Sequence, residues 1–195
     1  MHLWILSLML GLQPRAPWLA SYEDTAKAIA TVVTAEAPLF TGERGREKTA
    51  ALMVALAWAE SRFNPGAVGD HGLSVGLYQM SSANLPSPEG YRRADLLGHP
   101  IPASEIALHM LRQSFAVCAA LPLNARVAWY ASGDSYCQRG QSESRYRMGL
   151  AMRAFTKYPP PATYADAPTA AAPPAAAPTA TASTIVLGAT KQAVR

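Results

Sequence analysis

Apolar residues recur at the spacing of amphipathic helices in five stretches of the chain. The first runs from Ser21 to near Pro38, and Ser21 followed by Asp24 has the pattern of a capped helix start. The second, from Arg46 to Ser61, lacks Gly and Pro and is apolar on most sides, which predicts a helix central to the core. The others are predicted from Ser104 to Cys118, from Leu123 to Ala131 with a stop at Gly133, and from Ser142 to Tyr158.

Residues 64–86 interrupt this helical pattern with turn-forming residues. Short apolar pieces are separated by Asn64-Pro65-Gly66, Gly69-Asp70, Gly72, Gly76 and Pro86. Such punctuation is typical of turns and a small β-hairpin. We therefore expect a mainly α fold of the α+β type.

The two ends of the chain differ from its middle. Residues 1–20 contain an apolar stretch from Leu3 to Leu12, the length of a signal-peptide core and too short to span a bilayer. No Lys or Arg precedes it and Trp18 stands where a cleavage site needs a small residue, so a buried N-terminal helix is the alternative. Residues 159–195 are rich in Pro, Ala and Thr and predict a flexible tail. The folded domain is expected at 21–158.

Composition and charge indicate one folded domain with an anionic partner. Half of the 195 residues are hydrophobic, 15% are charged, and the net charge is +4. A cell-wall polymer or a nucleic acid would suit this charge, but no nucleic-acid recognition motif accompanies it. His71, His99 and His109 lack the clustering of a metal site, and no cofactor is indicated.

The two cysteines, Cys118 and Cys137, are too few for a disulfide scaffold and lack the paired spacing of a zinc site. They predict one disulfide if the protein is exported, and two buried free thiols otherwise.

Glu60 is the candidate catalytic residue. It ends a hydrophobic helix beside Trp58 and faces a Gly-rich loop. Desolvation there would raise the pKa of its carboxyl group and keep it protonated near neutral pH, as a general acid requires. A single Glu at a helix end is more often solvated or paired with a neighbour, so its position alone does not establish a catalytic role.

The residues that follow Glu60 strengthen this interpretation. The string Glu60-Ser61-Arg62-Phe63-Asn64-Pro65-Gly66-Ala67-Val68, then Gly72 and Gly76-Leu77-Tyr78-Gln79, resembles the soluble lytic transglycosylase family. That family's third motif, Ala-Tyr-Asn-Ala-Gly, is matched in part by Trp129-Tyr130-Ala131-Ser132-Gly133, where Ala131 replaces the Asn. Many members also carry a loop Ser where this chain has Gly69-Asp70-His71, and Ser74 is the candidate substitute.

This resemblance implies a lysozyme-like fold, with helices around a central helix and a small β-hairpin lobe that borders a substrate cleft. It implies that Glu60 acts as the single acid and base on peptidoglycan strands and leaves 1,6-anhydro ends. The residues expected to contact glycan are Ser61, Ser74, Gly76, Tyr78, Gln79 and Tyr130. Ser61 has the alternative of capping the helix end, Gly76 that of an ordinary turn, and Tyr78 and Tyr130 that of core packing.

Two alternatives remain for the function. In a hydrolysing lysozyme, Asp70 would be a second carboxylate that positions a water molecule, although Gly69-Asp70 is also typical of a turn. A non-catalytic wall-binding or assembly protein could keep the same cleft. Cleavage of the wall implies a periplasmic or secreted protein with no stable membrane insertion. Wall turnover, a secretion or conjugation channel, and phage entry or release are all compatible with the sequence.

Overall fold

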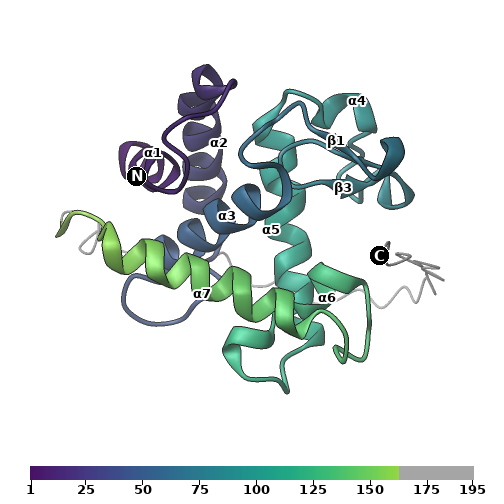
Figure 1. The fold of residues 1–195 in the computed structure, drawn as a ribbon. Helices are drawn as coiled ribbons and strands as arrows, with labels where there is room; N and C mark the ends of the chain where they lie inside the picture. The colour runs from purple at the N-terminus through teal and green to yellow at the C-terminus, as the bar shows by residue number, and fades with distance from the viewer. Residues whose placement is uncertain (163–195) are drawn as a thin grey trace.

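A computed structural model describes residues 1–162 of the protein; the predicted tail from residue 163 onward lies outside them. The described part is mainly helical, with a small antiparallel sheet in a lobe at one side (Figure 1). Its helices are α1 (His2–Leu12), α2 (Tyr22–Ala35), α3 (Gly45–Ser61), α4 (Arg93–Leu96), α5 (Pro100–Val117), α6 (Ala128–Ser132) and α7 (Gln141–Lys157).

Helix α3 is the centre of the fold. All eight residues from Ala50 to Ala57 have no exposed surface, and α1, α2, α5 and α7 pack against the helix. Its alternation of Ala with Leu, Met and Val lets neighbouring helices approach closely while it still buries apolar surface. The apolar pattern from Arg46 to Ser61 therefore predicted the central helix correctly.

Helix α1 is part of the same core. Trp4, Ile5, Leu8 and Met9 are buried, and the indole Nε1 of Trp4 donates a hydrogen bond to the backbone oxygen of Tyr158, 2.8 Å away. In this structure α1 packs as a buried helix. Removal of residues 1–20 as a signal peptide stays an untested prediction. Within residues 1–162, no helix combines the length and apolarity needed to cross a membrane.

The small lobe contains three short strands where the sequence predicted a hairpin. Strands β1 (Val68–Gly69), β2 (Ser74–Val75) and β3 (Met80–Ser81) pair antiparallel in that order. Val75 lies opposite Val68 and Met80. Gly76 follows β2 with a φ of +76°, and a Cβ there would lie 2.9 Å from the Leu96 oxygen of α4. Glycine is required by both the backbone angle and this close approach.

Two helix starts differ from the prediction. Ser21 makes no capping hydrogen bond with α2, because its hydroxyl donates to the Trp18 oxygen instead. Helix α5 begins at Pro100, four residues before the predicted Ser104. Proline is favoured in the first turn of a helix, where its missing N–H is not needed, so Pro100 starts this helix.

The predicted helix from Leu123 to Ala131 is wrong in its first half. Residues Leu123–Ala125 form a 3₁₀ turn, and α6 begins only at Ala128. The backbone between them is bound by a side chain from another helix: Ser144 accepts from the Val127 nitrogen and donates to the Asn124 oxygen. Helix α6 does end at Gly133, which has a φ of +67°.

A disulfide joins Cys118, at the end of α5, to Cys137, in the loop before α7. Both cysteines are buried. The bridge closes the segment that carries α6, so it ties the position of α6 to the end of α5.

Candidate active site

Glu60 lies in the last turn of α3, where the helix ends in a tight reversal. Arg62 and Phe63 both have left-handed backbone angles, with φ of 56° and 64°. Their N–H groups bind the Trp58 and Ala57 oxygens, and the Phe63 ring is fully buried. This anchored turn fixes the last residues of α3. Within them, the Glu60 side chain keeps 16% of its surface exposed.

Glu60 forms an ion pair with Arg147 of α7. The Arg147 Nη2 lies 2.7 Å from Glu60 Oε1, and the Arg147 side chain is 13% exposed. The sequence predicts an apolar, desolvated surrounding for Glu60 and gives no indication of this cation. In the sequence, the position of Arg147 is marked only by a charge next to the residues that form the buried face of α7, Ser144, Met148 and Ala151.

Tyr130 of α6 approaches the same pair. The ring is 8% exposed, and its hydroxyl donates to the Tyr78 backbone oxygen, 3.4 Å away. Burial raises the pKa of Tyr130 well above its usual value, and the negative charge of Glu60 adds to the increase. Tyr130 is therefore a neutral hydrogen-bond donor that connects α6 to the lobe, within the electrostatic range of Glu60.

Ser61 joins α3 to the small lobe. Its hydroxyl lies 2.7 Å from the Leu77 oxygen and 3.1 Å from the Ala57 oxygen, one turn earlier in α3. Because the Leu77 contact crosses from the helix to the Gly76-Leu77-Tyr78-Gln79 segment, Ser61 positions that segment beside Glu60.

Gln79 organises the lobe with its side-chain amide. The Nε2 group donates to the Gly76 oxygen at 2.9 Å and to the Ala67 oxygen at 3.3 Å. A Cβ on Gly69 would overlap Gln79 Oε1, so a larger residue at position 69 would displace the Gln79 amide. Both amide hydrogens are engaged inside the lobe, so the predicted glycan contact of Gln79 would fall to Oε1.

Ser74 and Asp70 bind each other across the turn between β1 and β2. Ser74 is 2% exposed, and its hydroxyl donates to Asp70 Oδ2 at 2.5 Å. Asp70 has a φ of 50°, a conformation that Asp tolerates better than most residues. The Ser74 hydroxyl is therefore committed to the turn, and the glycan contact expected of it stays a prediction.

Tyr78 belongs to the core. It is 1% exposed, and its hydroxyl lies 3.5 Å from the Ser104 hydroxyl of α5. Burial raises the pKa of Tyr78, so its hydroxyl stays neutral. The ring packs as the core alternative expected, and the sugar contact stays an untested prediction. The Tyr78 backbone oxygen accepts a hydrogen bond from the Tyr130 hydroxyl.

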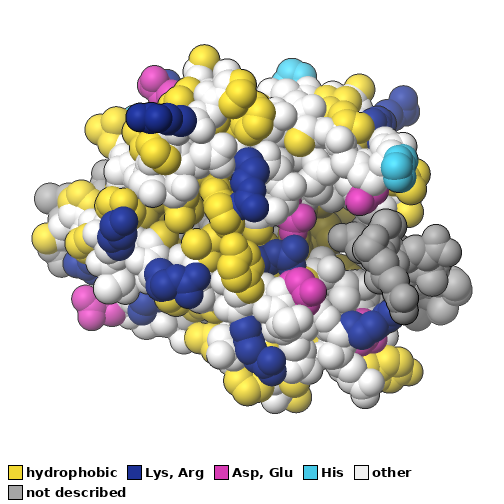
Figure 2. Space-filling model, in the orientation of Figure 1, with side chains coloured by type: hydrophobic (Ala, Val, Ile, Leu, Met, Phe, Trp, Pro, Cys, Tyr) yellow, Lys and Arg dark blue, Asp and Glu magenta, His cyan; other side chains and the backbone are white. Residues whose placement is uncertain are grey.

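The surface is hollowed between the small lobe and α6. Figure 2 shows this hollow to the right of centre, with acidic and basic side chains together beside it. Glu60, Arg147 and Tyr130 come from α3, α7 and α6, the three helices that meet across from the lobe (Figure 1). A carboxylate between two lobes is suited to proton transfer on a bound polymer.

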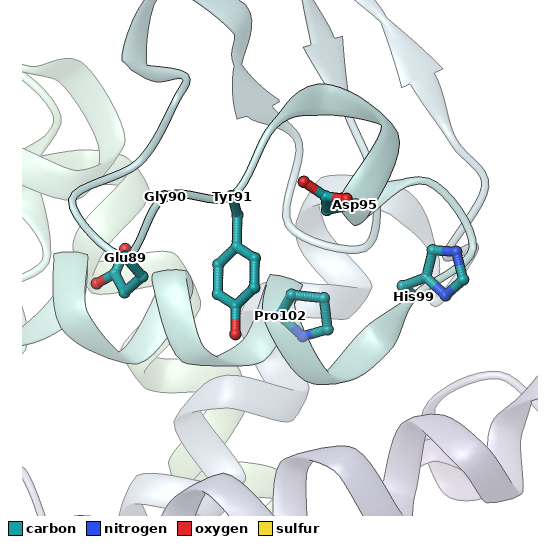
Figure 3. Close-up of a pocket in the computed structure, with 6 residues that line it drawn as sticks. All are labelled: Glu89, Gly90, Tyr91, Asp95, His99 and Pro102. Carbon is teal, nitrogen blue, oxygen red and sulfur yellow. The ribbon is translucent and has the colours of Figure 1, made fainter.

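A cavity of about 500 Å³ opens elsewhere, between α5 and the loop that leads to α4. Figure 3 shows the Tyr91 ring above α5, and its hydroxyl donates to Glu105. No predicted site residue contributes to the lining, which consists of Glu89, Gly90, Tyr91, Asp95, His99 and Pro102. Across residues 1–162, no three His, Cys, Asp or Glu residues are grouped in a way that could hold a metal ion.

The fold is lysozyme-like, with a mainly α body, a small antiparallel sheet and a partly buried Glu at the end of the central helix. The transglycosylase SLT domain family matches residues 39–149, more than half of the chain, and the protein belongs to this family. No curated protein and no solved structure matches the chain. The matched domain supports a glycan-cleaving role of the lytic transglycosylase and lysozyme type, with peptidoglycan as substrate.

Proposed function

We propose that the protein is a peptidoglycan lytic transglycosylase that cleaves the β-1,4 bond between N-acetylmuramic acid and N-acetylglucosamine. The observation that carries the proposal is the position of Glu60. Its carboxylate is partly buried at the end of α3 and forms an ion pair with Arg147. It lies beside the lobe that holds the Gly76-Leu77-Tyr78-Gln79 segment of the family resemblance.

The reaction needs one carboxyl group that changes roles. Glu60 donates its proton to the glycosidic oxygen, the bond from C1 of the muramic residue to that oxygen breaks, and N-acetylglucosamine leaves with a new hydroxyl. The carboxylate then takes the proton of the C6 hydroxyl as that oxygen bonds to C1. The product is a 1,6-anhydro end, Glu60 is again protonated, and no water is consumed. The acetamido group of the same sugar would stabilise the cationic intermediate.

Asp70 has a structural role in this proposal. Its carboxylate accepts the Ser74 hydroxyl within the β1–β2 turn, so it is engaged where the hydrolysing alternative needs it to orient a water molecule. The disulfide favours an oxidising compartment, which agrees with action in the periplasm or outside the cell.

The test compares Glu60→Gln, Asp70→Asn and the unmodified protein on purified sacculi, with the fragments identified by mass. Glutamine keeps the shape of the side chain but cannot carry the proton, so turnover should fall by at least about 10²–10⁴-fold. Asp70→Asn should retain most activity, and the unmodified protein should leave anhydro ends.

Other outcomes contradict the proposal in distinct ways. A folded Glu60→Gln variant that cleaves within a few-fold of the unmodified protein excludes Glu60 as the acid. Reducing ends, with activity lost in both variants, would indicate a hydrolysing lysozyme. Intact sacculi with retained binding would indicate a wall-binding protein.

A further inference from the structure

The ion pair between Glu60 and Arg147 bears directly on proton transfer. A general acid must be protonated when substrate arrives, whereas a guanidinium at 2.7 Å stabilises the ionised carboxylate. Both side chains are more than four-fifths buried, so solvent screens their attraction less than at the surface. Arg147 therefore biases Glu60 toward the state that serves as base.

Arg147 reaches Glu60 through one of the two terminal nitrogens of its guanidinium group. Arg147 Nη2 binds Glu60 Oε1, whereas Nη1 is buried and has no hydrogen-bond partner among residues 1–162. The Nη1 group therefore takes no part in holding the carboxylate. The contact through Nη2 orients Glu60 and still permits its protonation.

Two further titratable groups act on the pair. Tyr130 faces it from α6; burial and the charge of Glu60 raise the pKa of Tyr130, so the hydroxyl stays neutral and adds no charge. Glu143 lies one turn before Arg147 on α7. A hydrogen bond from Ser142 is the main cause that lowers the pKa of Glu143, with a small contribution from Arg147. Glu143 is exposed, so its charge is well screened and leaves the attraction between Arg147 and Glu60 largely intact.

We propose that Arg147 is a positioning residue that orients Glu60 and keeps it ionised in the free protein, so that it sets the upper pH limit of cleavage. This inference rests on the proposed function of Glu60 as the acid. The rate kcat/KM falls as pH rises through the titration of the acid in the free enzyme. A positive neighbour moves that fall to lower pH, and its removal moves the fall to higher pH.

The experiment measures the pH dependence of kcat/KM on solubilised glycan strands for the full chain and three variants. Arg147→Met should move the alkaline limb upward by about one to three pH units, the usual effect of an arginine beside a carboxylate. Arg147→Lys keeps the charge and should restore most of the original profile. Arg145→Met is the matched control, since Arg145 is exposed on the same helix and binds Gln141; its profile should not change.

A second measurement separates this inference from the function on which it rests. Carbon-13 NMR of the Glu carboxyl groups, with Glu60→Gln to identify the signal, follows the Glu60 titration without any turnover. The midpoint should rise in Arg147→Met even if another residue proves to be the acid. Arg147→Gln carries the same expectation if the Met variant does not fold. Equal midpoints in the unmodified and neutral variants, with only a lower melting temperature, would show that the pair is purely structural and overturn the proposal.

Discussion

The ion pair between Glu60 and Arg147 has opposing effects on the stability of the fold. Removal of two charges from water opposes the attraction between them, so a buried pair adds little net stability. Removal of only one member is costly, because the other charge remains desolvated without its partner. Loss of one member should therefore cost more free energy of unfolding than the intact pair contributes.

This dependence predicts strong coupling in unfolding experiments. Each of Glu60→Gln and Arg147→Met should lower the free energy of unfolding by about 1–3 kcal/mol, below the 3–5 kcal/mol of a fully buried pair because both side chains keep some exposure. The double variant should lose less than the sum of the two. Urea denaturation of all four proteins measures the coupling.

The control cycle replaces Arg147→Met with Arg145→Met, whose side chain contacts Gln141. That cycle should be additive within about 0.5 kcal/mol. Additive losses in the Glu60 and Arg147 cycle as well would mean that the pair contributes no coupling energy.

Residue roles were harder to predict than residue positions. The motif placed Glu60 correctly at the end of a helix, because a long apolar helix has a clear sequence pattern. Arg147 was missed because it lies 87 positions away and meets Glu60 only through the packing of α3 on α7. Ser74 was predicted to contact the glycan, whereas its hydroxyl binds Asp70 within the lobe. A sequence does not specify which neighbour a short polar side chain will bind.

Among the elements, the segment around α6 departs most from local sequence preference. Its first half was predicted as helix, but the buried hydroxyls of Ser114 and Ser144 bind the backbone of residues 124–130 and replace helical hydrogen bonds. Those partners come from α5 and α7, so only tertiary structure reveals them. The Cys118–Cys137 disulfide adds a covalent link to the same segment.

Loss of the disulfide should therefore destabilise the domain. The bridge spans 19 positions, and a loop of this size predicts a loss of about 3 kcal/mol in the free energy of unfolding on reduction. Denaturant unfolding with and without reductant measures this loss. The paired Cys118→Ala and Cys137→Ala variant should match the reduced protein and show no response to reductant. An unmodified protein that is also insensitive to reductant would contradict a stabilising bridge.

On the scale of the whole molecule, α1 packs into the same hydrophobic core as the helices around Glu60. Deletion of residues 1–20 would remove four buried side chains of α1, each worth about 1.5–3 kcal/mol of hydrophobic stabilisation. That total is comparable with the whole stability of a typical domain, about 5–15 kcal/mol. We expect the shortened protein to lose cooperative thermal unfolding, as measured by circular dichroism.

Deletion of residues 163–195 is the matched control, since their composition supplies neither a core nor site residues. That variant should cleave sacculi like the full chain. A protein without residues 1–20 that unfolds at the original temperature would favour the leader interpretation of this segment instead.

The overall architecture followed from the sequence because its strongest signals are long. The helices at 22–35, 45–61 and 141–157 each begin and end within a few residues of the prediction. The lobe was placed by its glycines, but the third strand and α4 were not expected. Strands of two residues and a helix of four carry too few positions for a periodic pattern.

The hydrogen bond from Trp4 to the Tyr158 oxygen brings together two positions 154 residues apart, and α1 lies beside the end of α7 (Figure 1). The polypeptide thus enters and leaves its folded body at neighbouring points. A body of this kind can be spliced into a surface loop of a larger host with little distortion of either partner. The two chain connections of the folded body therefore lie on the same side of it.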